Sequence, residues 1–373
     1  MMNYNTVYVG MDVHKESFSL CSFTIDSDNP CYYQKVTSDY RMILKYLERM
    51  RDIYGEQTKF ICGYEAGCLG YTLYHQLSKS GVECIILAPT TMSRETGKKV
   101  KTDKRDAAQI AKCLAFRTYS PVHVPTEEDE QIKEYIRMRD DHKIALKKVK
   151  QQILSFCLRH NIVYSETKTN WTRAHIQWLH QLKLEGLYGE ILSEYLISLN
   201  QLTEKINRFD ARIEEMASEC KYQENVHNLT CLLGIQTHTA LSILVEVGDF
   251  KRFSKPDKFA AYIGLVPGEN SSGEERCRLG ITKAGNTHVR KLLVESAQAY
   301  NRSAARGKSK KLHLRQQGCN PQIIAYADRA NDRLRRKYFR MILTNSKKSN
   351  VAKVAIAREL ACFIWGMMTE NYE

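Results

Sequence analysis

The fold of the first part of the chain is decided by the stretch VYVGMDVHKESFSLCSF, residues 7–23. Residues 7–12 and residues 18–23 are two runs rich in strand-forming side chains, and a short polar turn separates them. The stretch therefore predicts two adjacent strands that begin a sheet.

The residues that follow extend this sheet. Residues 60–64, FICGY, predict a further strand, and a helix through residues 71–77 ends at Gly81, a residue type suited to a C-terminal cap. Residues 82–87, VECIIL, predict another strand. Strands that come first in succession and then alternate with helices predict a mixed α/β domain over residues 1–125.

A second, helical region is predicted over residues 126–225. It opens with Thr126 and Asp129 in the spacing of a capping box. Farther on, apolar side chains recur at alternating steps of three and four, the a/d pattern of a coiled coil. This heptad seam consists of Leu192, Tyr195, Leu199, Leu202, Ile206, Phe209, Ile213 and Met216. The seam fits either an intramolecular helical hairpin or a coiled coil that joins subunits. We favour the second because the seam is narrow, and we therefore expect a homo-oligomer, either a dimer or a dimer of dimers.

The third region, residues 226–373, is predicted to be mainly helical and basic. The 373-residue chain carries a formal net charge of +14. Between Glu274 and Glu373 it has 21 Lys and Arg residues against 8 Asp and Glu residues. Such segregation is typical of a surface that binds a polyanion. The alternative is a solvated basic face without a partner.

The composition excludes several classes of protein. A chain with 43% hydrophobic and 26% charged residues is typical of a globular protein rather than a disordered one. The twelve cysteines include no C-x-x-C pair, which argues against a zinc site, and His14 and His288 are predicted to make polar contacts rather than to bind metal. Because no signal peptide and no apolar run long enough for a bilayer is evident, we expect a cytoplasmic location without a membrane partner.

Four carboxylates carry the chemistry of the first region. Asp12 ends the first predicted strand, and Glu65 follows the strand of residues 60–64. Asp103 and Asp106 lie three positions apart at the start of a predicted helix, which places them on one face. Four such carboxylates can hold a pair of hard cations, Mg²⁺ above all, beside the oxygens of a phosphoryl transfer. For Asp103 and Asp106 the simpler alternative is an interaction with the helix dipole. A basic flank that can attract a phosphate backbone consists of Lys98, Lys99, Lys101, Lys104 and Arg105.

Other motifs are weaker. Residues 232–235, LLGI, resemble half of a helix-hairpin-helix, and the glycine-rich residues 264–285 predict a loop. Residues 307–309, GKS, resemble the end of a phosphate-binding P-loop, but Arg302 stands where that motif requires its first glycine. We therefore predict single phosphate contacts from Lys308, Lys310, Lys311 and Arg315.

Several of these segments occur together as family signatures. The N-terminal ones are YVGMDVHK at 8–15, YEAG at 64–67 and KTDKRDA at 101–107. The C-terminal ones are FAAYIGLVP at 259–267, SSG at 271–273, GITKAGN at 280–286 and RKLL at 290–293. In sequence and order they resemble the signatures of the DEDD insertion-sequence transposases. That family includes the Piv and MooV invertases and recombinases guided by a bridge RNA.

The resemblance spans nearly the whole chain, and it implies a fold and a site. The fold would be a RuvC-like, RNase H-like first domain, a helical coiled-coil middle and a mainly α C-terminal transposase domain. Ser272 would be the nucleophile; without the resemblance, Ser271 and Ser272 are equal candidates. Lys283 and Arg290, in the C-terminal signatures, would contact nucleic acid. The metal-binding tetrad would consist of Asp12, Glu65, Asp103 and Asp106.

The sequence thus predicts a transposase or recombinase that cuts, exchanges and rejoins DNA strands in a prokaryotic nucleoid. The resemblance implies a phosphoserine intermediate and a structured guide RNA that selects the DNA sites. One alternative is a metal-dependent, structure-specific nuclease of the junction-resolvase kind, which would share the four carboxylates without needing Ser272. A second alternative is a non-catalytic basic scaffold for nucleic acid, against which the intact carboxylate set argues.

Overall fold

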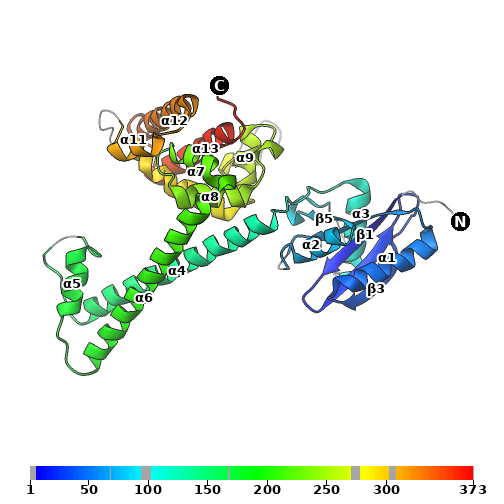
Figure 1. Ribbon diagram of the computed structural model, residues 1–373, viewed down its shortest axis with the longest axis horizontal. Coiled ribbons are helices and arrows are strands. Elements are labelled where there is room, and N and C mark those ends of the chain that lie inside the picture. The colour runs from blue at the N-terminus through cyan, green and yellow to red at the C-terminus, as the bar shows by residue number, and fades with distance from the viewer. Residues whose placement is uncertain are drawn as a thin grey trace. The chain divides into compact units, whose positions relative to one another are not determined.

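A computed structural model of the chain describes residues 6–67, 69–93, 102–166, 169–269, 278–301 and 308–372. The chain forms two compact units, Met1–Val124 and Pro125–Glu373 (Figure 1). By its contacts, the middle region belongs to the same unit as the C-terminal region. The division into three domains stays a prediction.

The first unit is built on a five-stranded sheet of order β3-β2-β1-β4-β5. The strands are β1 (Thr6–Val13), β2 (Ser17–Phe23), β3 (Cys31–Thr37), β4 (Lys59–Glu65) and β5 (Glu83–Leu87). Neighbours β1 and β2, and β2 and β3, are antiparallel, whereas β4 is parallel to both β1 and β5. The predicted mixed α/β sheet is confirmed. The edge strand β3 was not predicted.

Helices cover both faces of this sheet because its central strands are apolar on both sides. Side chains of Val7, Val9 and Met11 share one core with α1 (Tyr40–Tyr54) and α2 (Thr72–Lys79). Since successive residues of a strand point to opposite faces, Tyr8 points the other way and packs with α3 (Asp103–Phe116). A short 3₁₀ turn, η1 (Pro89–Thr91), follows β5.

The second unit begins with a long helical hairpin. It consists of α4 (Glu127–Arg159) and α6 (Leu187–Ala217); α5 (Arg173–Gln181) lies between them in the sequence and at the end of the hairpin away from α8 (Thr237–Val247) (Figure 1). The side chain of Thr126 caps α4 by accepting a hydrogen bond from the Asp129 backbone N–H. At one end of the hairpin Ile153 packs with Leu192 and Leu199, and at the other Ile132 packs with Ile213. The start of α4 therefore lies beside the end of α6, so the two helices are antiparallel.

The buried positions of the heptad seam are thus covered by α4 of the same chain. The structure shows the intramolecular hairpin, the alternative that we ranked second, and the subunit-joining coiled coil is not confirmed. The physical reason is that an a/d seam requires a facing apolar helix but does not specify which chain supplies it.

The rest of the second unit is mainly helical, as predicted. Its helices are α7 (Cys220–Thr230), α8 (Thr237–Val247), α9 (Pro256–Tyr262), α10 (Thr287–Ser296), α11 (Lys310–Gln316), α12 (Pro321–Phe339) and α13 (Ser349–Met368). The shorter elements are η2 (Phe250–Arg252), β6 (Pro267–Glu269), β7 (Arg278–Ile281), η3 (Ala297–Asn301) and the π-helical turn η4 (Arg340–Thr344). One apolar core joins α8, α10, α12 and α13. Across the described ranges, no helix has the length and apolar character needed to cross a bilayer.

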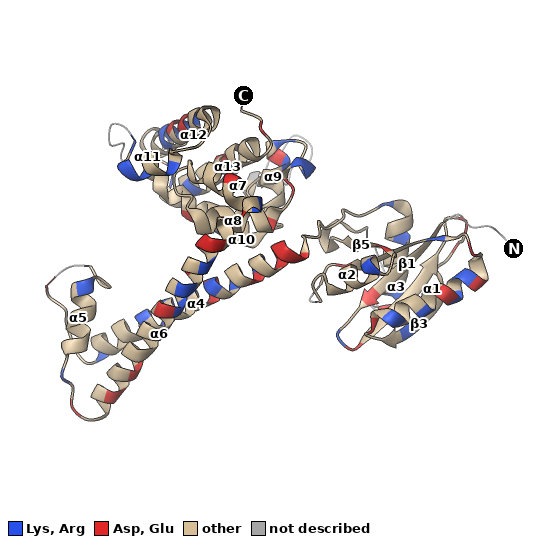
Figure 2. Cartoon of the chain, in the orientation of Figure 1, with Lys and Arg blue, Asp and Glu red and all other residues tan. Residues whose placement is uncertain are grey.

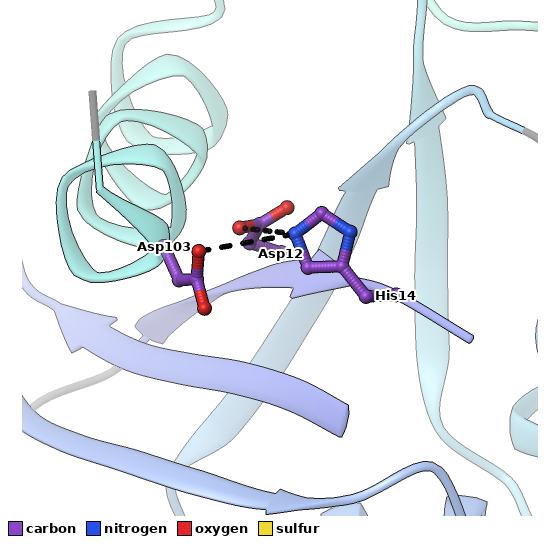
Figure 3. Close-up of side chains that lie close together, drawn as sticks. All are labelled: Asp12, His14 and Asp103. Carbon is purple, nitrogen blue, oxygen red and sulfur yellow. Dashed lines mark hydrogen bonds and ion pairs between the residues drawn. The ribbon is translucent and has the colours of Figure 1, made fainter. Parts of the chain in front are cut away.

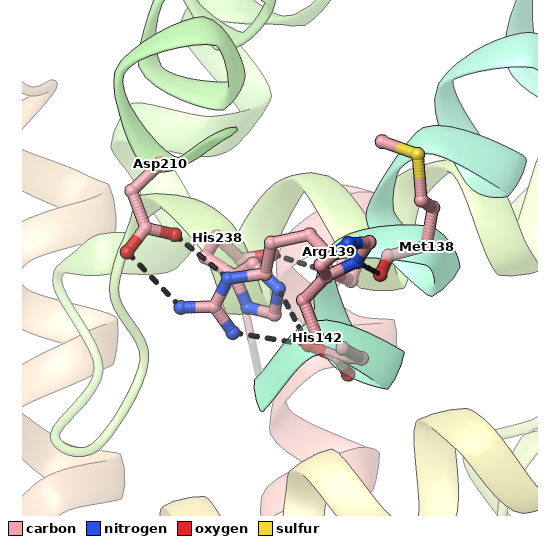
Figure 4. A network of polar contacts seen from close by, with 7 residues as sticks. Met138, Arg139, His142, Asp210 and His238 are labelled. Atoms are coloured by element: carbon pink, nitrogen blue, oxygen red, sulfur yellow. Dashed lines mark hydrogen bonds and ion pairs between the residues drawn. The ribbon is translucent and has the colours of Figure 1, made fainter. Parts of the chain in front are cut away.

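Two polar networks fix the base of the hairpin to α8. In the first, Arg139 of α4 donates to both carboxylate oxygens of Asp210 of α6, over 2.8 and 3.1 Å (Figure 4). Arg139 also donates to Asp140 over 3.0 Å, and His238 Nε2 of α8 lies 3.3 Å from the Asp140 carboxylate. Side chains from α4, α6 and α8 thus converge on Arg139 and Asp140.

The second network centres on Glu246 of α8, whose side chain is only 2% exposed. Arg137 of α4 donates to its two carboxylate oxygens over 2.9 and 3.2 Å, and Lys133 Nζ lies 3.8 Å away. Asn286, which caps α10, donates to the same carboxylate over 2.8 Å. A buried charge is costly unless it is paired, and here cations of α4 supply the pairing.

Candidate functional site

The first pair of predicted site residues lies at one edge of the sheet. Met11 of β1 and Tyr64 of β4 are partners in parallel register. Asp12 and Glu65 are the next residues of the two strands, so they lie at the same edge. Met11 and Tyr64 are buried beneath α1, and alternation directs Asp12 and Glu65 to the opposite face, which α3 covers.

The second pair reaches this edge because α3 lies unusually close to β1. A Cβ atom added to Gly10 would lie 2.0 Å from the Ala107 carbonyl oxygen and 2.4 Å from the Ala111 nitrogen. Only glycine leaves room for this contact. Asp103 precedes Ala107 by one turn on the same side of α3, so the contact directs the start of α3 toward Asp12.

Three side chains converge where the strand and the helix meet (Figure 3). His14 Nε2 lies 3.1 Å from Asp12 Oδ2 and 4.0 Å from Asp103 Oδ1. One potential ligand atom from each of Asp12, His14 and Asp103 lies within 4.8 Å of the other two. These three residues, called the Asp-His-Asp cluster below, form a possible site for a metal ion.

The electrostatics of the cluster favour a bound cation. Burial raises the pKa of Asp12, and the neighbouring carboxylates of Asp106 and Asp103 raise it further, although His14 partly offsets them. Asp103 is more exposed, and its pKa is lowered by a hydrogen bond of 2.8 Å from Lys35 Nζ of β3. The carboxylates of Asp106 and Asp103 therefore add negative charge near the half-buried Asp12. Oxygen ligands with excess negative charge are the donor set that hard divalent cations prefer.

The structure therefore brings the four predicted carboxylates to one region, but they do not all lie equally close to Asp12. Asp12 and Asp103 share the cluster, Asp106 acts electrostatically on Asp12, and Glu65 lies on the same face and edge. His14 makes a polar contact with Asp12, but it also belongs to the group that could hold a metal ion, so its predicted role stays a prediction. The available signal was its position two residues after Asp12, just beyond Val13, the last residue of β1.

Comparison with known proteins agrees with this arrangement. A model of the IS116/IS110/IS902 transposase family matches residues 226–313, and a DEDD transposase model of the IS110 type matches residues 9–161. A putative transposase, y4qE, of Sinorhizobium fredii is 33% identical over 369 residues, which cover 99% of this chain and 90% of the relative. The chain belongs to the IS110/IS116 family of transposases.

Other relatives of the transposase carry related names. The transposase of insertion sequence IS1533 of Leptospira borgpetersenii is 32% identical over 349 residues, covering 92% of this chain and 98% of the relative. A pilin gene-inverting protein of Moraxella lacunata is 22% identical over 275 residues, 71% of this chain and 74% of that protein. Membership of the DEDD family implies a RuvC-like fold for the α/β region. As a transposase, the protein is a DNA-cleaving and DNA-rejoining enzyme.

The predicted serine of the transposase lies outside the described residues, as do Ser271, Lys98, Lys99 and Lys101. The structure does describe the two strands that flank this segment, β6 and β7, which pair antiparallel. Arg290 Nη1 donates to the carbonyl oxygens of Ile263 and Ala284, over 2.8 and 2.9 Å. This arginine ties together the two chain segments that lead into and out of the β6–β7 hairpin.

The predicted nucleic-acid contacts of the transposase fall into two groups. Arg290 and Arg315 have backbone partners, since Arg315 Nη1 donates to the Ile235 carbonyl oxygen over 2.6 Å. Burial also lowers the pKa of Arg315. Lys308 is exposed but pairs with Asp328 and donates to Gln316. The other exposed members of the set are Lys104, Arg105, Lys283, Lys310 and Lys311. Figure 2 shows all Lys and Arg residues of the described chain in blue.

Proposed function

We propose that this transposase cuts and rejoins the DNA strands of its insertion sequence through two groups, a carboxylate-bound Mg²⁺ and the hydroxyl of Ser272. The observation that carries the proposal is the convergence of Asp12 and Asp103, on a strand end and a helix start, with Asp106 and Glu65 at the same edge. Carboxylates with a raised pKa, which Asp12 has chiefly through burial, are concentrated at functional sites.

The residues fit a divalent cation. Asp12 and Asp103 would bind it directly, and Asp106 and Glu65 would complete the oxygen ligand set. Lys35 holds the Asp103 carboxylate from the side of β3. When bound, Mg²⁺ would stabilise the negative charge that develops on the phosphate oxygens during phosphoryl transfer.

The role of Ser272 is supported by the family and by its sequence context. Gly273 follows it directly and leaves room for a phosphate to approach. The serine oxygen would form a bond to phosphorus, the bond from phosphorus to one sugar oxygen would break, and that oxygen would take up a proton. The phosphoserine keeps the energy of the phosphoester, so a free sugar hydroxyl can attack it and rejoin the strand without an external energy source.

The proposal extends to partners. In line with the family resemblance, a structured guide RNA would select the two DNA sites, and a homo-oligomer would hold two DNA ends together. The basic C-terminal part of the chain supplies positive charge that either nucleic acid needs. Binding of the RNA transcribed from the DNA beside the gene, measured against an unrelated RNA of equal length, would test the guide.

Five variants, two of them controls, test the chemistry. Asp12→Asn and Asp103→Asn remove charge at constant size, so DNA cleavage in Mg²⁺ should be lost while DNA binding persists. Glu83→Gln is the matched control, because this exposed carboxylate at the start of β5 pairs with Lys59. With a nicked substrate, the wild type should give a denaturant-resistant protein–DNA adduct that maps to Ser272. Ser272→Ala should abolish the adduct, whereas Ser271→Ala should retain it.

Two outcomes would count against the proposal. Full cleavage by Asp103→Asn in Mg²⁺ would show that the reaction does not need the carboxylates. Cleavage that gives no adduct and survives in Ser272→Ala would assign the attack to water, as in a metal-dependent nuclease of the junction-resolvase kind.

A further inference from the structure

Helix α12 has two faces of opposite character, and its buried face fixes its rotation. Asn331 is 6% exposed, and its side-chain oxygen accepts hydrogen bonds from the Leu233 N–H (2.8 Å) and the Tyr300 hydroxyl (3.0 Å). Its side-chain nitrogen donates to the Cys231 carbonyl over 3.1 Å. Three hydrogen bonds to one buried amide leave α12 little freedom to rotate about its axis.

The opposite face of α12 carries a stripe of arginines that runs onto the first residue of η4. Its members are Arg329, Arg333, Arg336 and Arg340, all of them exposed. Steps of four, three and four residues place one arginine on each successive turn of the same side. With a rise of 1.5 Å per residue, the stripe is about 16 Å long.

The stripe lines a groove of about 1180 Å³ between α12 and α13. Five cationic side chains, the four arginines and Lys337, face three acidic ones, Asp328, Asp332 and Glu359. Asp328 is already paired with Lys308, a lysine outside the lining of the groove. The groove therefore retains an excess of positive charge.

The ion pairs inside the groove do not compete strongly with an incoming anion. Arg336 pairs with Asp332 on an open surface, where its side chain is 76% exposed. Arg333 is 70% exposed although it pairs with Glu359. The Arg336–Asp332 pair is exposed on both sides and contributes about 0–1 kcal/mol, whereas Glu359 is only 13% exposed and holds Arg333 more firmly. The side chains of all four arginines are exposed and therefore remain available to a phosphate.

The spacing of the charges favours an extended partner. Charges spread over about 16 Å cannot converge on one small anion, whereas phosphates of one duplex strand recur about every 3.4 Å along the axis. Single strands are usually held by stacked aromatic rings. The ring of Tyr326 in this groove is buried, and Phe363 packs against the core.

From these observations we propose that the arginine stripe of α12 binds the phosphate backbone of duplex DNA. The contact is independent of the serine intermediate and of the metal site, since it requires only the DNA that any transposase must bind. It reads no sequence, because arginines along an exposed helix face bind phosphates rather than base edges. It positions the duplex on the C-terminal part of the second unit.

The test compares salt dependence in the full-length protein. The variant Arg329→Gln/Arg336→Gln/Arg340→Gln removes three charges and keeps Arg333 and Lys337 to pair with Glu359. By fluorescence anisotropy on a 30-base-pair duplex of the element's end, the log–log salt slope should become shallower by about two to three. Affinity near 0.15 M salt should fall roughly 10- to 100-fold.

Two companion variants make the result specific. The Arg→Lys triple at the same three positions should restore the slope, because a phosphate contact needs the charge. The triple Lys251→Gln/Lys255→Gln/Lys258→Gln removes three exposed charges elsewhere in the second unit and should change the slope much less. An unchanged slope for the arginine triple, or an equal change for the lysine triple, overturns the proposal. A change confined to RNA duplexes or to single-stranded DNA also overturns it.

Discussion

Gly10→Ala should separate α3 from the sheet and thereby disperse the Asp-His-Asp cluster. The new Cβ atom would lie 2.0 Å from the Ala107 carbonyl oxygen, whereas ordinary contacts begin at 3.4 Å. The obstacle is backbone on both sides, so no side-chain rotation can relieve it. α3 must move away by about 1 Å or more, at a strain of about 1–3 kcal/mol.

The functional loss should exceed the loss of stability. A displacement of about 1 Å at a catalytic group costs roughly 10²-fold in rate. We therefore expect DNA cleavage in Mg²⁺ to fall about 100-fold and the affinity for Mn²⁺, measured by calorimetry, to fall with it. Amide hydrogen exchange should speed up in α3, which reports on the first unit alone.

Gly67→Ala is the matched control in the same unit. Its Cβ atom would meet only the Glu65 carbonyl oxygen, at 3.7 Å, an ordinary contact. This variant should keep wild-type exchange in α3. If Gly10→Ala also kept wild-type exchange and wild-type Mn²⁺ affinity, the close packing of α3 on β1 would be refuted.

Three further variants test the second unit. Asn331→Leu leaves three buried hydrogen-bonding groups without their partner, so chemical denaturation should show a loss of about 3 kcal/mol or more; a loss below 1 kcal/mol would contradict the network. Leu199→Lys with Ile206→Lys places two charges inside the hairpin. Each unpaired ion destabilises the hairpin by several kcal/mol, so circular dichroism should show a loss of helix. Smaller assemblies with full helicity would instead support a subunit-joining seam. Burial alone would raise the pKa of Asp140, but the hydrogen bond and charge of His238 lower it below the ordinary value of 3.8. Asp140 therefore stabilises the fold above about pH 4 and loses this effect as the pH falls further, so Asp140→Asn should flatten the decline of melting temperature in acid, and an unchanged acid limb would argue against the pair.

The sheet and the position of its acidic residues could be predicted because they depend on local patterns. Alternation in β1 and β4 sets the face of Asp12 and Glu65, and the register of parallel neighbours sets their edge. Lys35 could not be predicted as a partner of Asp103. The two residues are 68 positions apart, and β3, the edge strand that carries Lys35, has a weak apolar pattern.

Contacts that depend on tertiary direction were harder to predict. Lys310 and Arg315 look equivalent in sequence, yet only Lys310 is exposed, whereas Arg315 turns inward to the Ile235 carbonyl oxygen. The heptad seam was hard to interpret for the same reason. The sequence shows that Leu199 needs an apolar partner, but not that Ile153 of the same chain supplies it. The arginine stripe of α12 was not predicted, because its position on the surface depends on which face of the helix Asn331 buries.

The placement of Glu246 has a consequence for exchanging modules between relatives. A chimera joined at residue 225 would inherit Glu246 and Asn286 from one parent and Lys133 and Arg137 from the other. Any mismatch among them would leave a buried carboxylate without its cations, a destabilisation of about 3–5 kcal/mol. A junction at residues 124 and 125 leaves the carboxylate and both cations within one parent. Parts of this transposase should therefore be shuffled with the helical hairpin attached to α8.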